Sequence, residues 1–224
     1  TGEPPKNAMV VEVTGKQFGW IFRYPGKDAV FGKKYYKNID PATNSVGIVW
    51  DDTYSKDDIL LEQTMYVVKG TPIKLILGSR DVIHDVGLTH FRLKMDAVPG
   101  IPTTMWFTPK YTTAQMKEKT GNPDFEYEIS CDQMCGKGHY SMKGIVKVVE
   151  PAEYLLWLAK QKPNYVMSNP PAETAPATPA APAADSNAAP DLPALHADHR
   201  STPSRSAPAT PPATPRTPAP RSAA

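Results

Sequence analysis

Hydrophobic positions along the chain recur in short runs, each bounded by polar residues or by Gly and Pro. Runs of this length, rich in Val, Ile, Phe and Tyr, predict β-strands rather than helices, because helices need longer periodic stretches. We expect strands at residues 9–13, 18–24, 65–68, 73–78, 91–95, 104–108, 125–129 and 145–149. The chain therefore has the pattern of an all-β protein.

The segments between these runs complete the picture. Residues 31–58 are polar and predict a long loop, and residues 69–72 predict a tight connection between two strands. Residues 113–119 predict a short helical turn. Residues 151–161 start with Pro, carry Glu153 in the first turn and continue with leucines, which is typical of a helix. Many short strands and one late helix predict a Greek-key β-barrel or sandwich with a short C-terminal helix.

Composition changes sharply near Met167. Almost every later residue is Pro, Ala, Ser, Thr, Asp or Arg, and the only larger aliphatic residues are Leu192 and Leu195. Such a segment cannot bury enough apolar surface to offset the entropy lost on ordering. We therefore expect one domain at residues 1–166 and a disordered Pro/Ala-rich tail at residues 167–224.

Charge and hydropathy exclude some classes of function. The formal net charge is +2, with Lys and Arg scattered, so nothing predicts nucleic-acid binding. No stretch of 18 apolar residues occurs that could span a bilayer, and no signal peptide is visible. The chain opens on a polar segment at Thr1, and we expect it to be a processed or trimmed piece of a longer protein.

The chain has two cysteines, with three residues between them, in the run Cys-Asp-Gln-Met-Cys-Gly-Lys-Gly-His-Tyr-Ser-Met. Metal-donor side chains fall at Cys131, Cys135, His139 and Met142. Soft sulfur with imidazole suits copper, and a weak axial Met is typical of electron-transfer copper sites. A single-copper site needs one Cys, so the second one suggests that both sulfurs bridge two metals.

Two bridged metals would each need an imidazole, and the run supplies only His139. His84, in Asp-Val-Ile-His after an apparent strand, is the best candidate for the other. His90 is a rival in a polar context, and His196 and His199 lie in the predicted tail. Bridging thiolates would let two coppers share one electron with little change in bond lengths, and a rigid β-scaffold would hold the ligands fixed.

Three other interpretations remain open at this point. The donor spacing also describes one face of a helix, although Gly136 and Gly138 oppose helix formation. Cys131 and Cys135 could form a plain disulfide, which leaves His139 unexplained. The two cysteines with two histidines would also make an ordinary tetrahedral zinc site.

Four segments together carry a family resemblance. The pattern C-x3-C-G-x2-H-x2-M resembles the dicopper (CuA) loop of cytochrome c oxidase subunit II. The stretches Val-Thr-Gly-Lys-Gln-Phe-Gly-Trp, Asp-Val-Ile-His and Lys-Met-Asp-Ala-Val-Pro-Gly resemble that family's first strands, upstream histidine segment and most recognisable internal run. They cover residues 9–150 in order. The resemblance implies a cupredoxin fold, on the periplasmic face of the bacterial inner membrane.

The resemblance also implies a role for each residue. Cys131 and Cys135 would be thiolates that bridge the two coppers, and His84 and His139 would each cap one copper. The thioether of Met142 and the backbone carbonyl of Gln133 would be the two weak ligands. In the family, this centre accepts electrons from cytochrome c and passes them to haem in oxidase subunit I, alongside other oxidase subunits. A chain of this kind is an electron-transfer module of a proton-pumping oxidase.

The sequence departs from the family at two places. The family has Glu where this chain has Gln133, and a neutral amide is a poorer magnesium ligand than a carboxylate, which argues against magnesium here. The Trp that accepts electrons in the family aligns with Phe18. Trp20 lies two residues later and would point to the same side of a regular strand as Phe18, so either residue could accept electrons; alternatively, Trp20 is a core residue. No C-x2-C-H haem motif occurs.

Acidic residues near the expected site could steer a basic cytochrome, or could be ordinary solvated charges: Asp51, Asp52, Asp81, Asp85 and Asp132. Two other functions stay open on the sequence. One is the CuA domain of a nitrous oxide reductase, which the run at residues 96–100 opposes. The other is a structural zinc module without a redox role.

Overall fold

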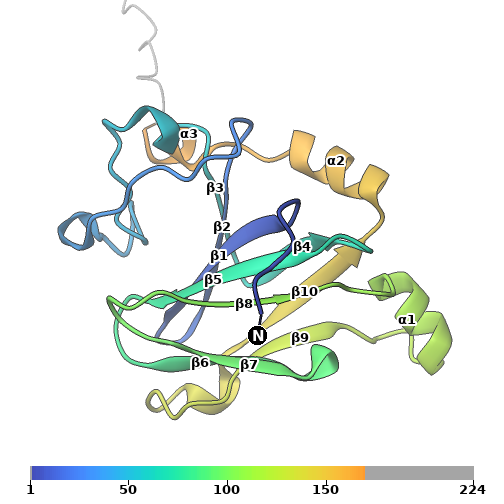
Figure 1. Cartoon of the computed structure of the whole chain (residues 1–224). Helices are drawn as coiled ribbons and strands as arrows, with labels where there is room; N and C mark the ends of the chain where they lie inside the picture. Colours follow the sequence, from blue (N-terminus) through green and yellow to red (C-terminus); the bar gives the residue numbers. More distant parts are fainter. Residues whose placement is uncertain (1, 170–224) are drawn as a thin grey trace, which may run out of the picture. The chain divides into compact units, whose positions relative to one another are not determined.

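The computed structural model describes residues 2–169, which form two five-stranded β-sheets around a shared core (Figure 1). The first sheet has the order β3-β2-β1-β5-β8, built from Ile59–Glu62, Gly19–Tyr24, Met9–Lys16, Ile73–Ser79 and Thr103–Phe107. The second has the order β4-β10-β9-β6-β7, built from Thr64–Val68, Lys143–Val149, Tyr127–Cys131, His84–Leu88 and Leu93–Ala97.

Short helices lie outside the sheets. Helix α1 is Thr113–Thr120, α2 is Pro151–Ala159 and α3 is Asn164–Ser168, with 3-10 turns at Tyr36–Asn38, Thr53–Ser55, Thr89–Phe91 and His139–Ser141. Helix α1 begins with a capping box, in which Thr112 and Gln115 each bond the other's backbone N–H. Within residues 2–169, no helix has both the length and the apolar character needed to cross a membrane.

Alternation along the strands builds the core. In β1, Val11 and Val13 are fully buried while their neighbours are only partly buried, and the parallel register pairs Val11 with Leu75 of β5. Each sheet contains one parallel pair of strands: β1 with β5 in the first sheet, and β10 with β4 in the second. Strands β4 and β5 are joined by a tight connection, but they do not pair and lie in different sheets. The connection at residues 69–72 thus crosses between the two layers.

Strand β2 is buried on both faces. Trp20, Phe22 and Tyr24 point into the main core, whereas Ile21 on the other face packs with Val46 and Ile48 of the segment between β2 and β3. The predicted loop at residues 31–58 contains no named strand, so that expectation is confirmed. Its role is to cover a sheet face that would otherwise be exposed.

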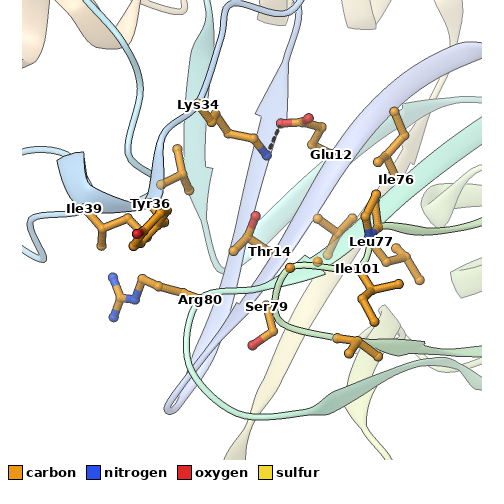
Figure 2. A pocket seen from close by; sticks show the side chains of 16 residues that line it. Glu12, Thr14, Lys34, Tyr36, Ile39, Ile76, Leu77, Ser79, Arg80 and Ile101 are labelled. Carbon is orange, nitrogen blue, oxygen red and sulfur yellow. Dashed lines mark ion pairs between the residues drawn. The ribbon is translucent and has the colours of Figure 1, made fainter.

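The covering segment is attached through a charge cluster, which we call the Arg23 cluster (Glu12, Arg23, Lys34 and Asp58); Arg23 and Asp58 are buried, and Lys34 lies at its exposed edge. Arg23 is 2% exposed and reaches Glu12 at 2.9 Å and Asp58 at 2.5 Å, and it also donates to the Gly32 carbonyl. Lys34 lies 2.9 Å from the same Glu12 (Figure 2). Two cations and two carboxylates therefore balance one another inside the chain.

The all-β, two-sheet architecture with a late helix is confirmed, and the differences are local. Strands β3 and β6 were not predicted. The prediction that His84 follows a strand formed by the residues directly before it is wrong, because His84 is the first residue of β6. The strand predicted at residues 91–95 starts only at Leu93, after a 3-10 turn. The tail was predicted to begin at residue 167, but Met167 and Ser168 belong to helix α3; the part of the predicted tail from residue 170 onward lies outside the described residues.

Candidate metal centre

The expected donor residues converge at one end of the barrel, on neighbouring strands of the second sheet. Cys131 is the last residue of β9 and His84 is the first residue of β6, the strand beside it. Met142 directly precedes β10, and its carbonyl accepts a hydrogen bond from the Cys131 N–H at 3.1 Å, which closes the loop between them. The loop at residues 132–142 is not helical apart from one 3-10 turn, so the helical-face interpretation is wrong.

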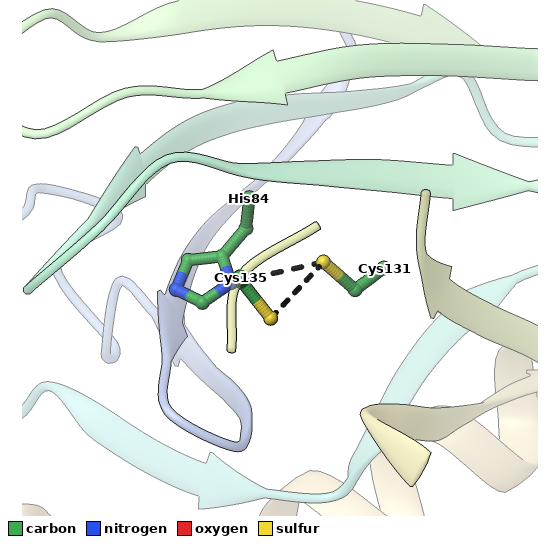
Figure 3. Close-up of side chains that lie close together, drawn as sticks. All are labelled: His84, Cys131 and Cys135. Carbon is green, nitrogen blue, oxygen red and sulfur yellow. Dashed lines mark hydrogen bonds between the residues drawn. The ribbon is translucent and has the colours of Figure 1, made fainter. Parts of the chain in front are cut away.

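Two thiols and one imidazole form the centre of this cluster (Figure 3). The Sγ atoms of Cys131 and Cys135 are 3.8 Å apart, and Cys131 Sγ lies 3.7 Å from His84 Nδ1. Both cysteines are free, and a disulfide needs a sulfur separation of about 2.05 Å. The disulfide interpretation therefore does not describe this structure.

The remaining donors surround the same pair of sulfurs. Cys135 Sγ lies 3.7 Å from His139 Nδ1 and 3.8 Å from Met142 Sδ. The Gln133 carbonyl oxygen lies 3.1 Å from Cys131 Sγ. Each sulfur thus has its own imidazole and its own weak donor beside it.

These separations suit metal coordination. A thiolate at about 2.3 Å and an imidazole at about 2.0 Å on one tetrahedral ion lie about 3.5 Å apart, and two thiolates lie about 3.8 Å apart. The donor pairs in the structure are 3.7–3.8 Å apart. Spacing alone fits zinc as well as copper, but the thioether of Met142 is a ligand that copper accepts and zinc sites rarely use.

His84 is held in the orientation that a ligand needs. Its Nε2 lies 2.8 Å from Asp81 Oδ1, which leaves Nδ1 directed at Cys131. A carboxylate on the far nitrogen of an imidazole fixes both the tautomer and the ring orientation of a metal ligand. From the sequence, Asp81 was expected only as a charge that could steer a partner, and this positioning role was not predicted.

Gln17 is a second residue that the sequence analysis missed. Its backbone N–H donates to Asp81 Oδ2 at 2.8 Å, and its side-chain Nε2 donates to the Cys135 carbonyl at 2.5 Å. The β1–β2 turn thereby fixes both the histidine segment and the cysteine loop. Nearby, a Cβ on Gly15 would lie 2.6 Å from the His84 ring, so glycine is needed for the ring to pack there.

Burial shapes the electrostatics of the centre. His84 has no exposed surface, Cys131, Cys135 and Met142 are at most 7% exposed, and His139 is only partly buried. Burial, followed by the neighbouring Cys131 thiol and the Asp81 charge, raises the pKa of Cys135 to about 11. Burial also acts to raise the pKa of Asp81, but hydrogen bonds from Gln17, His84 and Val82 outweigh it and lower that pKa. Metal binding at Cys135 therefore has to displace a proton.

The two aromatic candidates for receiving electrons occupy different environments. Trp20 has no exposed surface and its ring meets that of His84 edge to face at 6.1 Å, so it takes the core position. Phe18 precedes β2 rather than sharing its regular alternation, and it is 40% exposed. A Cβ on Gly138 would lie 2.5 Å from the Phe18 ring, so this ring packs against the cysteine loop.

Other candidates lie elsewhere or face inward. His90 packs edge to face against Phe125 and Tyr127, beyond the far end of β6 from His84. Asp85 is 4% exposed and cannot offer its charge to a partner, whereas Asp132 is exposed and accepts from Ser130. Asp52 accepts the backbone N–H of Lys33 within the covering segment.

Two facing five-stranded sheets with cysteine, histidine and methionine donors gathered at one end define a cupredoxin-like domain. Residues 9–149 match the family model described as the periplasmic domain of cytochrome c oxidase subunit II. The chain therefore belongs to the cytochrome c oxidase subunit II family. This membership sets aside the nitrous oxide reductase alternative.

Individual relatives agree with the family assignment. The chain is 37% identical over 159 residues to the alternative cytochrome c oxidase subunit 2 of Bradyrhizobium diazoefficiens, covering 70% of this chain and 53% of that protein. It is 32% identical over 152 residues to the heme-copper oxidase subunit 2 of Aeropyrum pernix, covering 67% and 48%. The chain thus spans about half the length of these relatives.

One solved structure is similar as well. It is the periplasmic domain of subunit II of cytochrome oxidase of Bradyrhizobium japonicum, with a TM-score of 0.48 and 25% sequence identity. The match covers 70% of this chain and 95% of that chain.

Proposed function

We propose that this chain is the electron-transfer domain of a haem-copper oxidase subunit II and binds two copper ions in a CuA centre. The observation that carries the proposal is the paired arrangement of donors: each of two neighbouring thiols has an imidazole Nδ1 at 3.7 Å. The proposed ligands are the side chains of five residues and one backbone carbonyl, from His84, Cys131, Cys135, His139, Met142 and Gln133. Family membership supports copper as the metal.

Copper, when bound, supplies a one-electron couple; the chain supplies a rigid and dry environment for it. Cys131 and His84 belong to paired strands, and the loop carrying Cys135 is closed by the Cys131–Met142 hydrogen bond. Asp81 and Gln17 hold the ring of His84 and the carbonyl of Cys135 in place. Ligands fixed by such contacts, four of them buried, keep the reorganisation that accompanies each electron small.

The proposed side of electron entry rests on the unequal exposure of the two imidazoles. His84 is enclosed, whereas His139 lies on a loop whose neighbours Met134 and Tyr140 are 73% and 82% exposed. Phe18 packs on the same loop. We propose that cytochrome c docks over this loop and that Phe18 and His139 lie nearest its haem, while Trp20 is buried against His84. Transfer to haem in oxidase subunit I would follow.

The proposed setting is a membrane-bound oxidase complex with its subunit II domain on the periplasmic side. The family description supports the periplasmic placement. Subunit I and other oxidase subunits would be the permanent partners, and cytochrome c the transient one. Magnesium is not part of the proposal, because Gln133 offers a neutral amide in place of a carboxylate.

Metal analysis combined with EPR spectroscopy tests the proposal. The full 224-residue chain, produced with copper, should hold two coppers and give a mixed-valence dicopper signal. A His90→Ala variant should behave identically, because His90 lies away from the centre. Stoichiometric zinc in a colourless protein, made with copper available, would instead favour a structural zinc module.

A further inference from the structure

A cavity of about 510 Å³ lies away from the metal centre, between the 3-10 turn Thr89–Phe91, the end of β8 and helix α1. Tyr127, at the start of β9, lines the cavity, and Cys131, at the end of the same strand, belongs to the centre. The strand advances four residue steps from Tyr127 to Cys131, which places the two residues about 13 Å apart. The cavity is therefore independent of the proposed copper ligands, and its size falls in the range of pockets that bind small molecules.

Aromatic rings make the walls of this cavity. Phe91 stacks on Tyr127 with ring centroids 4.9 Å apart and meets Phe107 at 4.4 Å. The polar atoms of Tyr127 and Trp106 already have hydrogen-bond partners. The Tyr127 hydroxyl donates to the Tyr111 carbonyl at 3.0 Å, and the Trp106 indole N–H donates to the Gly2 carbonyl at 2.7 Å. With these polar atoms engaged, the ring surfaces that line the cavity are apolar.

The charged residues of the lining are all cationic. Arg92, Lys110 and Lys119 line the cavity, and no Asp or Glu does. Within residues 2–169, none of the three has a carboxylate within 4.0 Å, whereas Lys34 of the Arg23 cluster has one at 2.9 Å. Lys119 instead lies 4.1 Å from the centroid of the Tyr111 ring. The positive charge at this rim is left without a partner in the described chain.

Arg92 also has an unusual backbone conformation. Arg92 has φ +57°, in the left-handed region that glycine adopts without strain. An L-residue there costs about 1 kcal/mol or more, as it also does at Ala29 and Gln63. The Arg92 side chain lines the cavity and makes no ion pair within residues 2–169.

We propose that this cavity binds a small organic anion with a flat apolar body, whose negative group pairs with Arg92 and Lys110 while its body packs on Phe91, Phe107 and Trp106. Apolar contact and charge are both needed, because exposed ion pairs alone contribute little. A free inorganic anion would leave the aromatic walls uncovered. This proposal is independent of copper binding at the other end of β9.

Two fluorescent probes that share an aromatic body test the proposal on the full 224-residue chain. Anilinonaphthalene sulfonate carries a negative group, and N-phenylnaphthylamine lacks it. The double variant Arg92→Gln/Lys110→Gln should weaken binding of the sulfonate about tenfold. It should leave binding of the neutral probe unchanged. Raising salt should weaken only the sulfonate.

The matched control is Lys33→Gln/Lys37→Gln, which removes two charges from another exposed surface where Lys37 lies 5.9 Å from the centroid of the Tyr36 ring. It should bind both probes as the parent does, and thermal unfolding should establish that both double variants fold. Equal weakening by the control, or equal loss of both probes, would overturn the proposal. The proposal would also be overturned if sulfate displaced the probe more strongly than chloride does at equal ionic strength. The cavity would then be a site for inorganic anions.

Discussion

The Arg23 cluster, with Lys34 at its exposed edge, and the candidate metal centre are both largely buried sets of polar side chains in one barrel, but they are completed differently. In the Arg23 cluster, Arg23 and Lys34 meet Glu12 and Asp58, so positive and negative charges balance within the chain. In the centre, soft donor atoms face one another at 3.7–3.8 Å, with no cation of the described chain among them. Buried polar groups normally find partners. The first set pairs its charges within the fold, although Arg23 Nε and Asp58 Oδ1 have no hydrogen-bond partner among the described residues. The second set would be completed by the proposed metal.

The largest expected effect is the loss of the dicopper centre in Cys135→Ser. A hydroxyl is a poor soft donor, and removing one bridge leaves the two metals without a shared ligand. We expect the mixed-valence EPR signal to disappear while the unfolding midpoint of the metal-free protein stays close to that of the parent. Retention of the native signal would contradict the bridging role of Cys135.

The next effect concerns the other buried set. Arg23→Met should lower the free energy of unfolding by about 3–5 kcal/mol, because it leaves the buried Asp58 carboxylate without its cation, while Glu12 keeps Lys34. Burial raises the pKa of Asp58, and the hydrogen bond and charge of Arg23 oppose that rise. Urea unfolding of the metal-free chain measures the loss.

The control for this variant is Arg80→Met, whose guanidinium makes one long contact, at 3.4 Å, with the Ser45 carbonyl. It should change stability by no more than about 0.5 kcal/mol. A double variant Arg23→Met/Asp58→Leu should recover part of the loss, because it removes the stranded charge as well. An Arg23→Met variant as stable as the parent would erase the distinction between the two buried sets.

A smaller effect is expected where the fold supports the centre. Asp81→Asn should weaken metal binding about 10–100-fold, because the amide holds the His84 tautomer and ring less firmly than the carboxylate does. Competition with a chelator measures the affinity. Asp132→Asn is the matched control, since it removes a charge beside Cys131 but contacts Ser130 rather than a donor. Equal losses in the two variants would indicate a general charge effect instead of a positioning role for Asp81.

The smallest expected effect is that of Met142→Leu. An axial thioether is a weak ligand that tunes the potential, so the variant should keep its dicopper signal while its reduction potential shifts on the order of tens of millivolts. Redox titration measures the shift. A Met142→Leu variant that loses copper as fully as Cys135→Ser would reverse the assigned order of ligand strength.

Sequence patterns predicted the parts of this molecule that depend on local chemistry. The strands with regular alternation, such as β1 and β5, were predicted because one face is buried and the other is not. Strand β6 was missed because all five of its residues are buried and it includes His84, Asp85 and Gly87, which have no β-forming pattern. Strand β3 is only four residues long.

The same division holds at the site. The donor set of the cysteine loop can be read from residue types and spacing alone, since soft ligands within twelve residues have few other uses. The supports from Gln17 and Asp81 could not be read this way, because they are 64 residues apart in sequence and meet only through tertiary structure. Long-range contacts of polar side chains leave no periodic trace in a sequence.

The parallel pairing in each sheet has a consequence for the order in which the protein matures. Strands β1 and β5, and likewise β4 and β10, are distant in sequence, and such non-local pairing is formed slowly. His84 and Cys131 meet only when β6 and β9 have paired, and Met142 joins them when β10 is in place. A newly made chain therefore has no preformed binding geometry until its barrel closes, so metal loading is expected to be one of the last steps of biogenesis.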